Sequence, residues 1–281
     1  MKTLEELRDT NGFIDISNLK LNKLENHRNI YNLDFNNKKY FFKTIFNISS
    51  IYNELIAEEI AKDYEIPSAH YDLAVLDGNI GVISENFLKD NETYTDMSSI
   101  LKTIYNDPED KTNHNNLTDI WNALSLIFKD EKIISDLMEQ IVNIFIFDIL
   151  IANSDRHDEN YGIITGTKTK MSPVYDNNFM LSGISLYDGD YSIKVESNMN
   201  EEDNILNKFL SISSLEYTEL LESKLWIIEE DNIDKIIKRV EERTNRKIEE
   251  RFKKNIKRDF SRQLRNIKTI LNNHIKKSYT K

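Results

Sequence analysis

The sequence of 281 residues contains no cysteine, only 3 prolines and 7 glycines, and no long uninterrupted hydrophobic segment. The absence of cysteine excludes disulfide bonds, thiolate metal sites and cysteine nucleophiles. A membrane-spanning helix needs about 20 apolar residues. The best apolar run, residues 141–152, is shorter and contains Asp148. Residues 1–8 mix acidic and basic side chains and lack the apolar stretch of a signal peptide, so we expect a cytoplasmic protein.

Charge is distributed unevenly along the chain. The net charge is −11, but residues 235–281 carry +12 and residues 1–234 therefore carry −23. Apolar residues recur every four positions between residues 248 and 264, which predicts an amphipathic helix. We expect its basic face to complement the acidic body, with i,i+4 pairs such as Glu249 with Lys253. Neither clustered aromatic residues nor a nucleic-acid-binding module accompanies the basic residues, so no nucleic-acid or membrane partner is expected.

The pattern of apolar residues changes from strand-like to helical along the chain. Alternation and turn signals predict strands over residues 28–35, 39–46, 70–76, 80–84, 161–165 and 170–174. Apolar residues at three- and four-residue spacing predict helices over residues 51–64, 117–128 and 131–151. We therefore predict an α+β fold with a small β-rich lobe over residues 1–88 and a larger helical lobe over residues 89–281.

A cluster of polar residues follows the apolar helix predicted over residues 131–151. Asp155 and Asn160 lie in the loop after this helix, and Asp176 follows a predicted strand farther on. Phosphoryl transfer to a hydroxyl requires one carboxylate that orients the acceptor and takes its proton. It also requires oxygen ligands that hold Mg²⁺ against the nucleotide phosphates. Asp155 fits the first role, and Asn160 with Asp176 fits the second.

The same loop also has a purely structural interpretation. Asn153 and Ser154 are typical of turns, where their side chains hydrogen-bond to their own backbone. In a sequence rich in asparagine, residues 153–160 would then form a solvated connection between a helix and a strand. The flanking predicted strands and the Pro-Val-Tyr-Asp run at residues 173–176 favour the functional interpretation.

These two motifs resemble those of a known family. Residues 153–160 read Asn-Ser-Asp-Arg-His-Asp-Glu-Asn and residues 173–176 read Pro-Val-Tyr-Asp. Together they resemble the HipA-like serine/threonine kinases, bacterial relatives of the protein-kinase fold that include toxin–antitoxin kinases and a secreted effector kinase. The similarity extends from about residue 40 to residue 181. The Asp-Arg-His-x-x-Asn core is also similar to the catalytic loop of phosphatidylinositol kinases, and the Pro-x-Tyr-Asp run favours the HipA-like family.

The resemblance implies a bilobal protein-kinase-like fold and a role for each matching residue. Asp155 would be the catalytic base, and Asn160 and Asp176 would be the Mg²⁺ ligands. His157 would belong to the catalytic loop, more as a buttress of its turn than as a group that touches substrate. Asp148 would support this loop through hydrogen bonds. Arg156 would either pair with a phosphorylated or acidic residue or lie exposed with no specific role.

The resemblance also implies a nucleotide site in the β-rich lobe. Lys43 would bond the α- and β-phosphates of ATP, and a helix carboxylate, Glu54 in preference to Glu58, would hold the lysine in position. Backbone groups around Glu85 and Phe87, where the lobes join, would hydrogen-bond the adenine edge. A phosphate-binding loop is expected near residues 23–30, where His27, Arg28 or Asn29 would contact phosphate.

One feature departs from the family pattern: residues 23–30 contain no glycine, although phosphate-binding loops usually do. A nucleotide-binding pseudokinase therefore stays an alternative, as does a lipid or small-molecule kinase with the same loop. The favoured hypothesis is an ATP- and Mg²⁺-dependent serine/threonine protein kinase that acts as toxin or effector, with an antitoxin or regulatory partner. It would be a compact family member, and secretion as an effector by a non-classical route is an alternative to the cytoplasm. Autophosphorylation is expected either at hydroxyl residues of the segment 180–191 or near the nucleotide loop.

Overall fold

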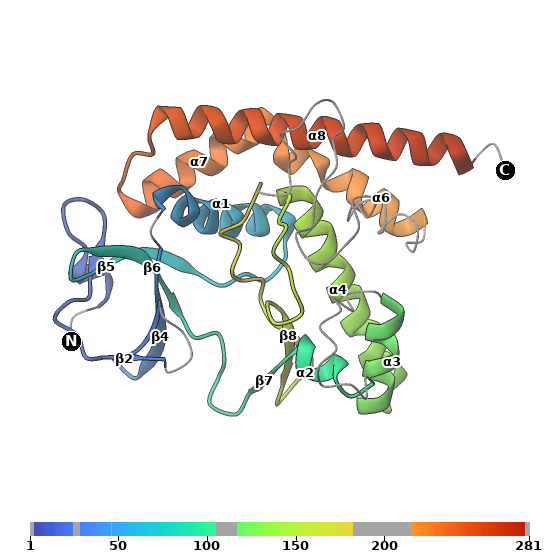
Figure 1. Ribbon diagram of the computed structural model, residues 1–281, viewed down its shortest axis with the longest axis horizontal. Helices are drawn as coiled ribbons and strands as arrows, with labels where there is room; N and C mark the ends of the chain where they lie inside the picture. The colour runs from blue at the N-terminus through green and yellow to red at the C-terminus, as the bar shows by residue number, and fades with distance from the viewer. Residues whose placement is uncertain (1–2, 25–28, 46, 105–116, 182–214, 279–281) are drawn as a thin grey trace.

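The computed structural model describes residues 3–24, 29–45, 47–104, 117–181 and 215–278 (Figure 1). Its N-terminal part contains a six-stranded sheet. A short 3-10 helix, Glu5–Leu7, precedes the sheet. The strands follow the order β1-β5-β6-β4-β3-β2. They are β1 (Ile14–Asp15), β2 (Leu21–Lys23), β3 (Ile30–Phe35), β4 (Lys38–Thr44), β5 (Tyr71–Leu76) and β6 (Asn79–Glu85). All neighbours are antiparallel except β1 and β5, which are parallel.

Two tight turns fix the register of this sheet. Asn36 and Asn37 connect β3 to β4 with φ of 52° and 62°, and Asp77 and Gly78 connect β5 to β6 with φ of 49° and 81°. Two-residue hairpin turns favour positive φ at both central residues because this matches the twist of the strands. Both hairpins were predicted from these turn residues and are confirmed. The central strand β4 pairs with β3 on one side and β6 on the other, which places Lys43 opposite Ile30 and Val82.

Helix α1 (Ile48–Tyr64) packs against the sheet on one side and the C-terminal helices on the other (Figure 1). The side chain of Asn47 caps its first turn by accepting a hydrogen bond from the Ser49 N–H. Glu65 ends it in the left-handed conformation, two residues before Pro67. Carboxylate as well as apolar side chains of α1 are buried, including Glu54, Glu58 and Glu59. This helix therefore lies inside the molecule rather than on its surface.

The helical part begins after β6. Strand β7 (Thr93–Asp96) pairs with β8 (Gly162–Thr165), which pairs with β9 (Lys170–Met171). Helices α2 (Met97–Leu101) and α4 (Glu131–Ile151) pack beside this small sheet, and α3 (Leu117–Ile127) packs on both of these helices. The bounds of α4 are those predicted from its apolar spacing. The predicted α+β class is confirmed, and none of the described helices is long and apolar enough to cross a membrane.

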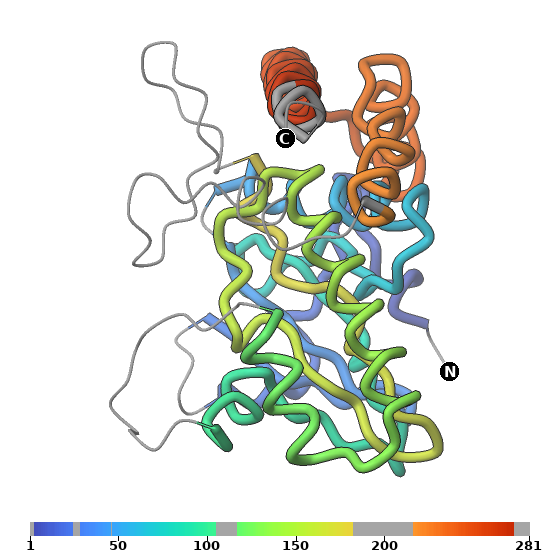
Figure 2. Tube along the Cα trace, turned by 90° about the vertical axis from the view of Figure 1, so that its right-hand side faces the viewer, coloured from blue at the N-terminus to red at the C-terminus, as the bar shows by residue number. Residues whose placement is uncertain are grey.

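A layer of C-terminal helices covers α1 and α4. It consists of α6 (Leu215–Lys224), the 3-10 turn η2 (Leu225–Ile228), α7 (Glu230–Thr244) and α8 (Glu250–Ser278). Figure 2, which looks along α8, shows this helix beside α7 at one edge of the molecule. The predicted apolar stripe of residues 248–264 is confirmed: Ile248, Ile256 and Phe260 are buried, and Phe252 and Leu264 are partly buried against the same core. The predicted pairing of Lys253 with Glu249 is wrong, because Lys253 binds Glu241 on α7 and Glu250 instead.

Candidate active site

The loop predicted to be catalytic starts where α4 ends. Ala152 adopts the left-handed conformation with φ of 48°, and the Asn153 N–H donates to the Asp148 carbonyl oxygen. A non-glycine residue at positive φ costs conformational energy, and such residues are frequent at functional sites. The chain therefore leaves α4 sharply at Asn153. The side-chain Oδ1 of Asn153 accepts a hydrogen bond from the Asp155 N–H at 3.2 Å, as expected for a turn residue.

Arg156 is the structural centre of this loop. Its Nε lies 3.0 Å from Asp148 Oδ2, and its Nη1 donates to the carbonyl oxygens of Asn160 at 2.9 Å and Tyr175 at 2.7 Å. Its Nη2 donates to Asn177 Oδ1 at 2.6 Å. The side chain is buried, so the alternative of an exposed arginine is wrong, and the expected support of the loop by Asp148 is confirmed. One guanidinium thus joins residues 153–160 to residues 175–177.

Asp155 and Asn160 face each other across the turn. Asn160 Nδ2 donates to the Asp155 carbonyl oxygen at 2.9 Å, while the Asn160 N–H donates to the His157 carbonyl oxygen. His157 Nδ1 accepts from the Glu159 N–H at 3.3 Å, so the imidazole braces the turn. Partial burial raises the pKa of Asp155, and the nearby charge of Asp176 raises it further, whereas His157 and Lys43 act in the opposite direction.

Asp176 reaches the same place from the strand segment after β9. Residues 67–69 align this segment, because the Val174 N–H donates to the Pro67 carbonyl oxygen and the Ala69 N–H to that of Val174. Asp176 itself has φ of 55°, and its N–H donates to the Tyr71 hydroxyl at 3.1 Å. Its carboxylate forms an ion pair with Lys43 Nζ from β4. Two predicted site residues that are distant in the sequence are therefore in direct contact.

The expected ion pair between Lys43 and Glu54 is not formed. Glu54 Oε2 accepts from the Asn177 N–H at 2.7 Å, and its Oε1 is buried without a hydrogen-bond partner among the described residues. Burial, followed by the nearby Asp176 charge, raises the pKa of Glu54 to about 8. Lys43 instead forms its ion pair with Asp176, whose carboxylate is less buried than that of Glu54. Glu58 is turned away from the site and binds His70 and Arg243.

The connection between the two parts of the chain lies beside this site. Glu85 ends β6 and forms a surface ion pair with Lys38 at 2.8 Å, so its side chain points to solvent. The Phe87 ring packs against Tyr94 and Tyr175 with centroid distances of 6.0 and 5.9 Å. The hydroxyls of Tyr94 and Tyr175 are 2.6 Å apart, and Tyr175 also donates to the Glu159 carbonyl oxygen at 2.9 Å. Through these rings, the segment after β6 that contains Phe87 contacts the loop of residues 153–160.

The donor atoms fit a magnesium–nucleotide complex. Asp176 offers carboxylate oxygens and Asn160 an amide oxygen, and Mg²⁺ in proteins is typically held by one or two such ligands together with phosphate oxygens and water. No cluster of three or more histidine or carboxylate residues that could hold a metal by itself exists in the described ranges. Asp176 and Asn160 are thus the residues that could hold the metal, with phosphate oxygens and water as its other ligands.

Two predicted features lie partly outside the described residues. Residues 25–28 of the expected phosphate-binding loop, including His27 and Arg28, are not described, whereas the Asn29 carbonyl oxygen accepts from the Thr44 N–H at 2.9 Å. The segment 180–191 is described only to Leu181, so its hydroxyl residues also lie outside. The roles of Tyr71, Tyr94 and Asn177 were missed. Of these three residues, only Asn177 could have been suspected from the sequence, because it directly follows Asp176.

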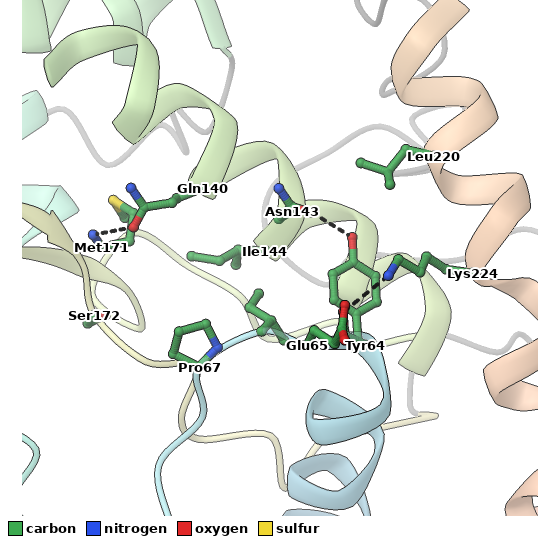
Figure 3. Close-up of a pocket in the computed structure, with 11 residues that line it drawn as sticks. Tyr64, Glu65, Pro67, Gln140, Asn143, Ile144, Met171, Ser172, Leu220 and Lys224 are labelled. Atoms are coloured by element: carbon green, nitrogen blue, oxygen red, sulfur yellow. Dashed lines mark hydrogen bonds between the residues drawn. The ribbon is translucent and has the colours of Figure 1, made fainter. Parts of the chain in front are cut away.

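A cavity of about 270 Å³ lies beside Met171 and Ser172 (Figure 3). It is lined by the end of α1, by α4, by Met171 and Ser172, and by Lys224 of α6. Asn143 Oδ1 accepts from the Tyr64 hydroxyl at 3.0 Å, and Lys224 Nζ donates to the Tyr64 carbonyl oxygen at 3.3 Å (Figure 3). The polar groups of this cavity thus hold the C-terminal end of α1 against α4 and α6.

Comparisons with known proteins agree with this geometry. The Helicobacter pylori proinflammatory kinase CtkA superposes with a TM-score of 0.66 at 18% identity, covering 95% of this chain and 99% of that one. HipA of Shewanella oneidensis, in a complex with HipB and operator DNA, superposes with a TM-score of 0.56 at 13% identity, covering 90% and 67%. No curated protein matched in the sequence search.

These likenesses show a kinase-like fold, which confirms the predicted architecture. The model of the HipA-like C-terminal domain matches residues 20–248, which span most of the chain and all four residues Lys43, Asp155, Asn160 and Asp176. Family and fold together support a phosphotransferase. The protein belongs to the HipA-like family, as its two motifs predicted.

Proposed function

We propose that the protein is an ATP- and Mg²⁺-dependent kinase that phosphorylates serine or threonine hydroxyls of a protein substrate. The observation that supports this most is the convergence of four polar residues from separate elements. Lys43 comes from β4, Asp155 and Asn160 from the loop after α4, and Asp176 from the segment after β9. Of these groups, Lys43 and Asp176 are in contact, and the charge of each affects the pKa of Asp155.

In the proposed reaction the substrate hydroxyl oxygen attacks the γ-phosphorus of ATP. A bond forms between these atoms, the bond from the γ-phosphorus to the bridging oxygen breaks, and ADP leaves with that electron pair. Asp155 orients the hydroxyl and accepts its proton. The partial burial that raises the pKa of Asp155 makes it a better proton acceptor. His157 keeps the loop in shape through the Glu159 N–H.

The remaining residues bind and orient the nucleotide. Asn160 and Asp176 are the proposed metal ligands, and bound Mg²⁺ would neutralise charge on the transferred phosphoryl group. Lys43 would exchange its contact with Asp176 for the α- and β-phosphates, and Glu54, whose free oxygen lies in the same buried region, would hold it there. Backbone groups at Glu85–Phe87 would bind the adenine edge, with residues 1–88 and 89–281 as the two lobes.

A protein substrate is favoured over a lipid by the Pro-Val-Tyr-Asp run at residues 173–176. The related HipA was solved in a complex with HipB, which supports an antitoxin or regulatory protein as partner of this chain as well. A cytoplasmic site of action fits such a role. Secretion as an effector is the alternative consistent with the likeness to a kinase described as proinflammatory.

The decisive experiment compares the wild-type protein with Asp155→Ala. We expect γ-phosphate transfer to a protein panel to be lost in Asp155→Ala while ATP–Mg²⁺ binding and the thermal unfolding temperature are retained, because Asp155 is proposed to act on the acceptor hydroxyl. Phosphoinositides and choline serve as parallel acceptors. Wild-type turnover by Asp155→Ala would refute the assignment. ATP binding without transfer by the wild type would identify a pseudokinase, and transfer only to the small acceptors would identify a lipid or small-molecule kinase.

A further inference from the structure

The inner side of α1 holds the backbone that follows the proposed metal ligand Asp176. Glu54 accepts from the Asn177 N–H at 2.7 Å. Asn53 Nδ2 donates to the Asn178 carbonyl oxygen at 2.9 Å and to that of Met180 at 3.2 Å. Adjacent residues of one helix therefore bind a continuous stretch of backbone, and displacement of α1 would carry this stretch with it.

The outer side of α1 is held by α7 through two arginines. Arg239 lies 2.9 Å from Glu59 Oε2 through its Nε and 2.8 Å from Asp63 Oδ2 through its Nη2. Arg243 Nη1 lies 2.7 Å from Glu58 Oε1. Glu58 and Glu59 are buried, with 2% and 4% of their surface exposed. Buried carboxylates require cationic or hydrogen-bonded partners. Lys62 of α1 itself and His70 also pair with these carboxylates, and the arginines of α7 are the partners that tie α1 to the C-terminal helices.

A second route connects α7 to Asp176 through β5. The carboxylate of Glu58 that binds Arg243 through Oε1 accepts from the Tyr71 N–H through Oε2 at 3.1 Å. The Tyr71 hydroxyl in turn accepts from the Asp176 N–H at 3.1 Å. Arg243 thus fixes a carboxylate that fixes the backbone of Tyr71, and the side chain of Tyr71 supports Asp176 at its positive φ.

Both ends of α1 are also attached to the helical part. At its C-terminal end, Tyr64 binds Asn143 of α4 and Lys224 of α6 (Figure 3). At its N-terminal half, the Tyr52 hydroxyl accepts from Arg246 Nε, just after α7, at 3.0 Å. The apolar side of α7, with Ile233, Ile236 and Val240, is buried in the same core as Leu55, so the two helices share one packed interface (Figure 1).

We infer that α7 is a clamp on α1, and that Arg239 and Arg243 are positioning residues that set the backbone of residues 176–180 for metal and nucleotide binding. The catalytic consequence of the clamp rests on the proposed function. The clamp itself does not, because it concerns how firmly the backbone of residues 176–180 is held in the protein without ligands.

The test is hydrogen exchange of residues 172–181 in the full chain, measured for wild type, Arg243→Ala and Arg239→Ala. Mutations along a coupled path change local equilibria by a few-fold to tens of fold, so we expect exchange at residues 176–178 to accelerate about tenfold in Arg243→Ala. Lys257→Ala is the matched control. Lys257 binds Asp234 at 3.1 Å and Glu230 at 3.6 Å within the same helical layer, and neither partner belongs to α1.

Binding of ATP–Mg²⁺ by calorimetry gives a second readout, and the dissociation constant is expected to rise about tenfold in Arg243→Ala and to stay unchanged in Lys257→Ala. The conservative variant Arg239→Lys keeps a positive charge beside Glu59 and Asp63 and should retain more of the wild-type protection than Arg239→Ala. If Arg243→Ala does not fold, the test is made with Arg239→Ala. The Arg239 side chain is more exposed than that of Arg243, 38% against 19%, so its removal disturbs the folded core less.

Exchange at residues 176–178 that is no faster in Arg243→Ala than in Lys257→Ala would overturn the clamp, and so would an equal loss of protection in Arg239→Lys and Arg239→Ala. These outcomes are separate from the fate of the proposed function. If Asp155→Ala keeps wild-type phosphoryl transfer while exchange responds as expected, the proposed function fails and the clamp stands. If transfer depends on Asp155 but exchange does not respond, the clamp fails and the kinase assignment stands.

Discussion

Asp148 and Arg156 form a buried ion pair beneath the candidate catalytic loop, with Arg156 Nε 3.0 Å from Asp148 Oδ2. Arg156 Nη2 also donates to Asp148 Oδ1 at 3.1 Å, so the two side chains meet in a forked arrangement. The remaining donors of Arg156 hold the carbonyl oxygens of Asn160 and Tyr175. This pair therefore determines how the loop that carries Asp155 meets the segment that carries Asp176.

Replacement of Arg156 by alanine should destabilise the whole protein. It would leave Asp148 as a buried carboxylate without its cation, and breaking a buried ion pair on one side typically costs about 3–5 kcal/mol. Urea unfolding should show this loss. The matched control is Arg258→Ala, because Arg258 is 57% exposed and pairs with its neighbour Asp259 at the surface, where such pairs contribute less than about 1 kcal/mol. Equal effects of both variants would contradict the structural role of Arg156.

Asp176→Asn should remove the dependence of ATP binding on Mg²⁺. In the wild type we expect Mg²⁺ to increase ATP affinity because Asp176 is a proposed ligand, whereas an amide oxygen is a weaker ligand for this cation. Calorimetric titration of ATP with and without MgCl₂ measures the difference. Asp34→Asn, which changes an exposed carboxylate on β3, should behave like wild type. A variant Asp176→Asn that keeps the full Mg²⁺ effect would exclude Asp176 as a ligand.

The tyrosine pair beside the loop allows a paired comparison. Tyr175→Phe removes the hydroxyl that donates to the Glu159 carbonyl oxygen, next to Asn160, whereas Tyr94→Phe removes only its contact with Tyr175. Loss of one hydrogen bond costs about 1 kcal/mol, so both variants should unfold at slightly lower denaturant concentration. Turnover should fall several-fold only in Tyr175→Phe. The same turnover in both variants would show that the bond to Glu159 has no positioning role.

Much of the scaffold was predictable because its signals are local. The pairs Asn36–Asn37 and Asp77–Gly78 specify hairpin turns by their tolerance of positive φ, and the apolar spacing of residues 131–151 gave both ends of α4. Helix α7 was missed although its apolar residues, including Ile233 and Val240, also have helical spacing. The dense charge around them obscured that signal.

The contacts that organise the site were not predictable, because their partners are distant in the sequence. The burial of Arg156 depends on Asp148, Tyr175 and Asn177 meeting around it, and an arginine in a polar loop gives no local sign of this. Likewise, Lys43 was expected to pair with Glu54 or Glu58 rather than with Asp176. Its contact with Asp176 follows from how α1 and the segment after β9 pack, which no short-range pattern encodes.

Glu54→Gln should make the protein more stable at alkaline pH. Burial raises the pKa of Glu54 to about 8 in the folded state, above its value of about 4.5 in the unfolded chain. The unfolded chain therefore releases this proton first, and stability is lost as pH rises from about 4.5 through 8. Glutamine keeps the oxygen that accepts from the Asn177 N–H at every pH, and carries no charge that must be buried.

The free energy of unfolding should thus be nearly equal for wild type and Glu54→Gln at about pH 4, below the pKa of Glu54 in the unfolded chain. At pH 9 the variant should be more stable by more than about 2 kcal/mol, since each unit of pKa difference corresponds to about 1.4 kcal/mol. Urea unfolding across this pH range measures the effect, with Glu219→Gln on the exposed side of α6 as the control. A constant difference between the two proteins at all pH values would mean that Glu54 stays ionised in the folded protein. The buried Glu54 carboxylate would then need a positively charged partner, and Lys43 would have to leave Asp176 to become that partner.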